Sequence, residues 1–148
     1  MNRRNQIQHR YVDLIPKDLD EGILYISRRF KTASHLCCCG CGSRVVTPLN
    51  PAKWQLIDHS STVSLSPSIG LGALPCKSHY WIRRSRIDWY PNMTDAQTRH
   101  AQVADEYASQ VFTGERLPTP PSSKNTPISA QTIHKWRRLI SWFSSLFR

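Results

Sequence analysis

Apolar and polar residues alternate over short stretches in the first ninety residues of the chain. The apolar run at residues 23–26 predicts a buried strand, and residues 79–83 and 86–90 predict a hairpin in which Tyr80 and Ile82 face away from Trp81. Several further short runs of the same kind occur, each bounded by turn residues. About seven such strands predict a mainly β domain, built as a small sheet, a sandwich or a partly open barrel.

The periodicity changes after residue 93. Thr94 followed by Gln97 forms the pattern of a capping box, in which each side chain satisfies a backbone N–H at a helix start. Val103, Tyr107 and Val111 then recur at helical spacing. The pattern predicts one amphipathic helix over residues 95–112, packed against the sheet.

Four segments follow from these patterns: a basic tail at residues 1–10, a β-rich domain with its helix at 11–112, a Pro-rich linker at 113–127 and a basic amphipathic helix at 128–148. The last helix has Trp136, Leu139 and Phe143 on one side and Arg137 and Arg138 on the other. Such a helix can lie on an anionic membrane, dock into a partner's groove or fold back onto its own domain. The Pro-rich tether favours partner docking.

Net charge and the absence of long apolar stretches indicate which partners and which location to expect. The chain has 20 basic and 10 acidic residues, a net charge of +10. Much of this excess lies in the two ends, which favours electrostatic tethering over a shaped nucleic-acid groove, so nucleic acid is not the expected partner. The N-terminus lacks the apolar run of a secretory signal and no stretch is long enough to span a membrane, so we expect a cytoplasmic protein, in contact with a membrane only at its periphery.

The five cysteines are clustered as expected of metal ligands. Four of them lie in residues 37–41, and the fifth begins the Cys-x-x-His pattern of Cys76 and His79. In a reducing compartment, such clusters bind metal more often than they form disulfides. Zinc takes four thiolate or imidazole ligands. Five candidates compete for four places: the preferred set is Cys39, Cys41, Cys76 and His79, with Cys37 in reserve.

Five stretches of the sequence, taken together, resemble a known bacterial family. They are Leu-Tyr-Ile-Ser at residues 24–27, His-Leu-Cys-x-Cys-Gly-Cys-Gly at 35–42, Val-Thr-Pro-Leu at 46–49, Val-Ser-Leu-x-Pro-Ser-Ile-Gly at 63–70 and Pro-Cys-x-Ser-His-Tyr-Trp-Ile at 75–82. Over residues 11–89 the chain resembles the bacterial domain of unknown function 6527. It departs from that family's usual pattern at Cys38 and at Arg84-Ser85, where a glycine turn is common.

This resemblance implies a cytoplasmic protein encoded beside ubiquitin-like proteins and their E1-like and E2-like enzymes. It also implies a peptidase-like hydrolase that processes or removes the ubiquitin-like protein. The alternative is a non-catalytic zinc-binding adaptor for the conjugation enzymes.

A hydrolase needs a nucleophile or an activated water. Ser68 follows a strand and precedes Gly70, so its hydroxyl can be exposed at a sharp bend, and His35 is the candidate base. Zinc with an open position could activate water instead. Both residues also have structural interpretations: Ser68 as a turn cap, and His35 as a core residue or a metal ligand. Asp58 and Asp88 are the candidates for a third, orienting group.

Overall fold

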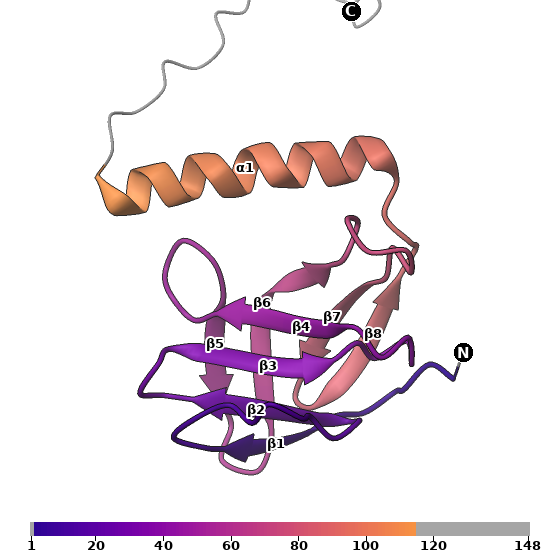
Figure 1. Cartoon of the computed structure of the whole chain (residues 1–148), viewed down its shortest axis with the longest axis vertical. Helices are drawn as coiled ribbons and strands as arrows, with labels where there is room; N and C mark the ends of the chain where they lie inside the picture. Colours follow the sequence, from indigo (N-terminus) through magenta and orange to yellow (C-terminus); the bar gives the residue numbers. More distant parts are fainter. Residues whose placement is uncertain (1, 115–148) are drawn as a thin grey trace, which may run out of the picture. The chain divides into compact units, whose positions relative to one another are not determined.

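The computed structural model describes residues 2–114, which form two four-stranded sheets and one helix (Figure 1). The predicted helix at 128–148 and nearly all of the predicted linker lie outside this range. No helix among the described residues is long and apolar enough to cross a membrane.

The first sheet has the strand order β1-β2-β3-β4, with β1 parallel to β2 and the other pairs antiparallel. The second has the order β5-β6-β7-β8 and is antiparallel throughout. The strands are β1 (Gln8–Tyr11), β2 (Ile23–Ser27), β3 (Thr32–Leu36), β4 (Arg44–Pro48), β5 (Gln55–Asp58), β6 (Val63–Gly70), β7 (His79–Arg83) and β8 (Arg86–Tyr90).

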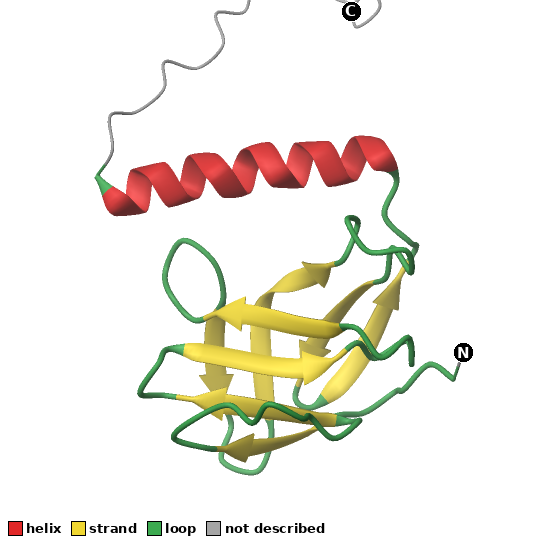
Figure 2. Cartoon of the chain, viewed as in Figure 1, coloured by secondary structure: helices red, strands yellow, loops and turns green. Residues whose placement is uncertain are grey.

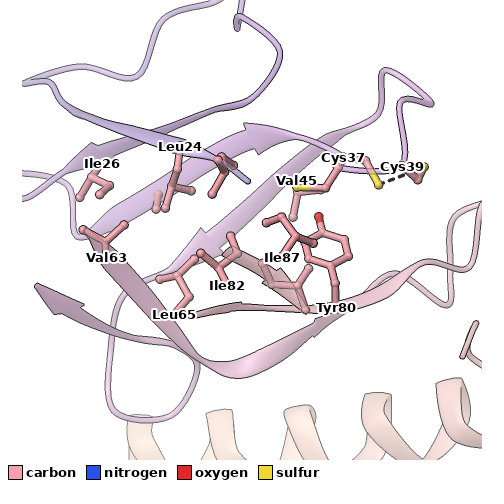
Figure 3. Packing of buried hydrophobic residues seen from close by; sticks show 14 residues of the cluster. Leu24, Ile26, Cys37, Cys39, Val45, Val63, Leu65, Tyr80, Ile82 and Ile87 are labelled. Carbon is pink, nitrogen blue, oxygen red and sulfur yellow. Dashed lines mark hydrogen bonds between the residues drawn. The ribbon is translucent and has the colours of Figure 1, made fainter. Parts of the chain in front are cut away.

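The core lies between the two sheets. Leu24 and Ile26 point from β2 toward Val63, Leu65 and Ile82 of the second sheet, and all five are almost completely buried (Figure 3). Burial of apolar side chains on two facing sheets is the main stabilising term in such a sandwich. The prediction of a mainly β domain is therefore confirmed, and the two sheets do not close into a barrel (Figure 2).

The N-terminal residues take part in this fold. Gln8–Tyr11 form β1, although the sequence pattern places nearly all of them in a polar tail. Ile7 is buried, and the backbone N–H of Arg4 donates to the carbonyl of Cys38 at 2.9 Å. The backbone hydrogen bonds to β2 and to residue 38 explain why a polar segment is ordered without an apolar pattern of its own.

The β7–β8 hairpin forms at the predicted residues. Tyr80 and Ile82 are buried and Trp81 faces the other way. Arg84 and Ser85 have φ angles of 48° and 61°, so they adopt the left-handed conformation that favours glycine in a two-residue turn. Arg83 pairs with Arg86 on either side of this turn, so the hairpin closes with a two-residue loop.

The helix α1 (Asp95–Thr113) begins at the predicted capping box, in which Thr94 accepts from the backbone of Gln97 and its own N–H donates back to the Gln97 side chain. Lys53 forms an ion pair with Asp105 of the helix at 2.5 Å. A Cβ at Gly72 would collide with Thr98, so this glycine lets the helix start approach the sheet. No residue of α1 is buried, and Val103 of the predicted apolar stripe is 69% exposed.

Substitution of one buried and one exposed leucine tests the position of the core. We expect Leu65→Ala, at a buried position of β6, to lower the free energy of unfolding by about 2–5 kcal/mol because it leaves a cavity between the sheets. Leu14→Ala is the matched control, since Leu14 is 71% exposed and its loss should cost less than about 0.5 kcal/mol. Chemical denaturation measures both. Equal losses would contradict the sandwich core.

Candidate functional site

Ser68 lies beside an irregularity in β6. Leu65 pairs with Ile82 and Ile69 pairs with Tyr80, so four steps along β6 correspond to only two along β7. The two extra residues form a bulge between the buried Leu65 and Ile69, and Ser68, which directly precedes the inward-facing Ile69, faces outward. A bulge of this kind is a common device for aiming one side chain out of a regular sheet.

His79 lies on the same outer face. It pairs with Gly70 across the sheet, and its neighbour Tyr80 points into the core, so the imidazole must point outward. Its Nε2 lies 3.0 Å from the Ser68 hydroxyl oxygen, within hydrogen-bond distance. The Tyr90 ring lies beside the imidazole, with the ring centroids 5.2 Å apart. Both Ser68 and His79 are partly exposed.

The Ser68–His79 pair borders a groove of about 540 Å³ between the second sheet and α1. Small residues line both walls, so a chain can approach the serine closely; they are Gly70, Gly72 and Ala73 on the sheet side and Ala101, Ala104 and Ala108 on the helix. The Lys53–Asp105 ion pair joins the two walls, and both residues line the groove. The groove is therefore mostly apolar and reaches the serine hydroxyl.

His35, the base expected from sequence, lies in the core and not beside Ser68. It is fully buried, and its Nε2 is 2.9 Å from the Tyr80 hydroxyl in the core. Burial lowers the pKa of His35 to about 4, so the imidazole is neutral at pH 7. Its Nδ1 has no hydrogen-bond partner among the described residues. The structure thus pairs Ser68 with His79 rather than with His35.

Neither carboxylate considered from sequence bonds to His79. Asp58 accepts hydrogen bonds from Tyr11 at 2.5 Å and Arg28 at 3.0 Å, whereas Asp88 lies 3.5 Å from Arg83. Within residues 2–114, no carboxylate forms a hydrogen bond with the His79 ring. The arrangement is a Ser–His pair.

A second Ser–His contact exists on the same sheet. His59 Nε2 lies 3.0 Å from the Ser64 hydroxyl, but that hydroxyl also accepts the backbone N–H of Arg84 at 2.8 Å. Ser64 is buried and helps to hold the β7–β8 turn, so its hydroxyl is less accessible to a substrate than that of Ser68. The spacing of residues gives no signal for this contact.

The cysteines form a separate cluster at one end of the sandwich. The sulfurs of Cys37, Cys39, Cys41 and Cys76 all lie within 4.8 Å of one another. A tetrahedral metal with bonds to sulfur of about 2.3 Å places its sulfurs about 3.8 Å apart, so this group could hold one metal ion. Figure 3 shows Cys37 and Cys39 side by side at the edge of the core, with their sulfurs 3.3 Å apart.

The loop that follows β3 is built to bring these thiols together. The N–H of Cys37 donates to the carbonyl of Ser43 at 2.8 Å, which closes the loop. Gly40 and Gly42 have φ angles of 81° and 72°, a conformation that costs a residue with a side chain more. Cys76 enters from the loop before β7, so the cluster joins the two sheets.

Within the cluster, burial raises the pKa of Cys37, whereas local contacts lower the pKa of Cys41. Burial would raise the pKa of Cys41, but hydrogen bonds from Ser43 and from the thiols of Cys39 and Cys76 outweigh it and lower the pKa to about 6. A thiolate is the form that binds metal. Cys38, by contrast, is buried outside the cluster, and burial raises its pKa to about 12.

The ligand set expected from sequence contains His79 and holds Cys37 in reserve. In the structure Cys37 is a member of the cluster, and His79 is not. The alternation of β7 carries the missing signal: with Tyr80 facing the core, His79 faces away from Cys37, which is itself buried in the core. The Cys-x-x-His spacing alone favours His79 as a ligand, whereas the alternation of β7 excludes it.

The fold and the site define a β-sandwich domain with a four-cysteine cluster and a Ser–His pair that borders a groove. The chain belongs to the family described as "Bacterial ubiquitination-like system serine protease (BubE)", whose model matches residues 11–90. Those residues include Ser68, His79 and all four clustered cysteines. The match supports the link to a ubiquitin-like system that the resemblance implied, whereas the numbered-domain name stays a prediction. No curated protein and no solved structure matches the chain significantly.

Metal content discriminates between the two ligand sets. We expect the purified protein to contain one divalent ion per chain and Cys76→Ala to remove it, because three thiols hold the ion more weakly than four. His79→Ala and Cys38→Ala should retain the ion. Elemental analysis of the four proteins is the measurement; loss of metal from His79→Ala would contradict the four-cysteine site.

Proposed function

We propose that the protein is a serine peptidase that processes or removes the ubiquitin-like protein of its conjugation system. The hydrogen bond between Ser68 and His79 on an accessible groove supports this function most strongly. The family description supports the reaction class and the partner. Ser68 is the nucleophile and His79 the general base.

In the first half of the reaction, His79 Nε2 removes the proton of the Ser68 hydroxyl as the oxygen attacks the scissile carbonyl carbon. A tetrahedral intermediate forms, and His79 then gives that proton to the leaving amine. The product is an ester between Ser68 and the N-terminal part of the substrate. In the second half, His79 activates a water that hydrolyses the ester and restores the serine.

Within the part of the chain that the structure describes, packing rather than a carboxylate positions His79. The imidazole is fixed from one side by its strand and from another by the Tyr90 ring. The groove excludes part of the solvent around the pair, which strengthens the interaction of the developing imidazolium with the oxyanion. A base within hydrogen-bond reach of a serine can activate its hydroxyl for acyl transfer.

The four-cysteine site would hold zinc as a structural ion. Four thiolates fill the tetrahedral coordination of zinc and leave no position for water, so the ion takes no part in the reaction. Its contribution is to fix the loop before β7, which leads directly into His79. Reduced thiols also favour a cytoplasmic location. The E1-like and E2-like enzymes are the expected further partners.

Substitution of the two residues tests this proposal. With a precursor in which the ubiquitin-like protein carries a C-terminal extension, Ser68→Ala should lower kcat by roughly a thousandfold or more because no acyl-enzyme can form. His79→Ala should lower it comparably, since the serine loses its base. The rate of precursor cleavage, followed by mass spectrometry, is the measurement.

The second Ser–His contact supplies a matched control. His59→Ala breaks a hydrogen bond of equal length on the same sheet, yet should leave kcat for the precursor unchanged, because neither His59 nor Ser64 takes part in the acyl transfer. If His59→Ala abolishes cleavage while His79→Ala does not, the assignment is wrong. Stable binding of the precursor without turnover by the wild-type protein would instead favour the non-catalytic adaptor.

A further inference from the structure

The outer face of the second sheet continues beyond the Ser68–His79 pair. Strand alternation places Trp81 and Arg83 on the same face of β7 as His79, and Ser66 on the same face of β6 as Ser68. A second hollow, of about 570 Å³, is lined by Ser66, Trp81, Arg83 and Arg86 among others. Ser66 of this hollow directly precedes Pro67, which lines the groove at Ser68. The two hollows therefore share strand β6.

Three arginines surround this second hollow. Arg83, Arg84 and Arg86 are all exposed at the β7–β8 turn. Asp88 is the one acidic residue among those that line the hollow, and it already lies 3.5 Å from Arg83. Among the described residues, Arg84 and Arg86 form no salt bridge. The rim therefore carries uncompensated positive charge.

The floor of the hollow is apolar. Ile57 is 45% exposed there, and the Trp81 ring lies 4.2 Å from the Arg83 guanidinium. A tryptophan with arginines around an aliphatic residue is the composition typical of the energetic centre of a protein–protein interface. Nucleic acid fits less well, because Arg83 covers the aromatic face on which a base would stack.

We propose that this arginine-rimmed surface binds an acidic patch on the folded body of the ubiquitin-like substrate. The inference rests on the proposed function and adds a second point of attachment to it. Arg83 lies four positions after His79 on β7, a distance of roughly 13 Å at the rise of a strand. An extended tail of about four residues spans that distance. The body can thus sit at the arginines while its tail lies at Ser68.

Charge reversal at the turn, measured with two substrates, tests the inference. Arg84→Glu/Arg86→Glu should raise KM for the folded precursor roughly tenfold, because two favourable charge contacts become repulsive. A short peptide that carries only the residues around the cleavage site does not reach the surface, so its kcat/KM should stay unchanged. Arg29→Glu/Lys31→Glu, in the turn between β2 and β3, makes the same change in net charge and should affect neither substrate.

Binding separates failure of this inference from failure of the proposed function. If the wild-type protein cleaves neither substrate, the peptidase assignment fails, but calorimetry can still show the Ser68→Ala protein binding the precursor and losing that affinity on Arg84→Glu/Arg86→Glu. Equal effects on precursor and peptide, or no effect on either, would overturn the docking surface. The docking surface would also be overturned if Arg84→Glu/Arg86→Glu abolished binding to a 20-nucleotide oligonucleotide and left the affinity for the precursor unchanged.

Discussion

The pairing of β6 with β7 is the constraint on which the rest of the site depends. Leu65 and Ile69 of β6 face the core together with Tyr80 and Ile82 of β7, and β6 accommodates two extra residues between its two inward positions. Alternation next to the inward residues Ile69 and Tyr80 turns Ser68 and His79 outward, and the pairing of Gly70 with His79 brings the two side chains within hydrogen-bond distance. Core packing thus holds Ser68 and His79 together, and no carboxylate among the described residues bonds to the imidazole.

The four-cysteine cluster lies just before β7, at the end where His79 begins the strand. Cys76 lies three residues before His79, and its sulfur meets those of a loop that follows β3 in the opposite sheet. An ion at this point would link both sheets and limit movement of the segment that leads into β7. The cysteine cluster, the core and the Ser68–His79 pair are therefore connected through β7.

The sequence was sufficient for the class of fold and for part of the site. Alternation identified the β7–β8 hairpin, and the Thr94–Gln97 pattern identified the start of α1, because both depend on interactions between near neighbours. Strand β1 escaped prediction since its order comes from backbone pairing with β2. The cysteines could be recognised as a cluster, but the choice between Cys37 and His79 required the direction of each side chain. The partner of Ser68 depended on the register between two strands, which a single sequence does not encode locally.

The most direct test of the account is to map the serine that reacts with a fluorophosphonate, since such reagents trap an activated serine without any knowledge of the substrate. The account predicts one adduct, on the peptide that contains Ser68, and its loss in His79→Ala. An adduct on Ser64 or on another serine, or labelling of Ser68 that persists without His79, would contradict the pairing of these two residues as the reactive centre.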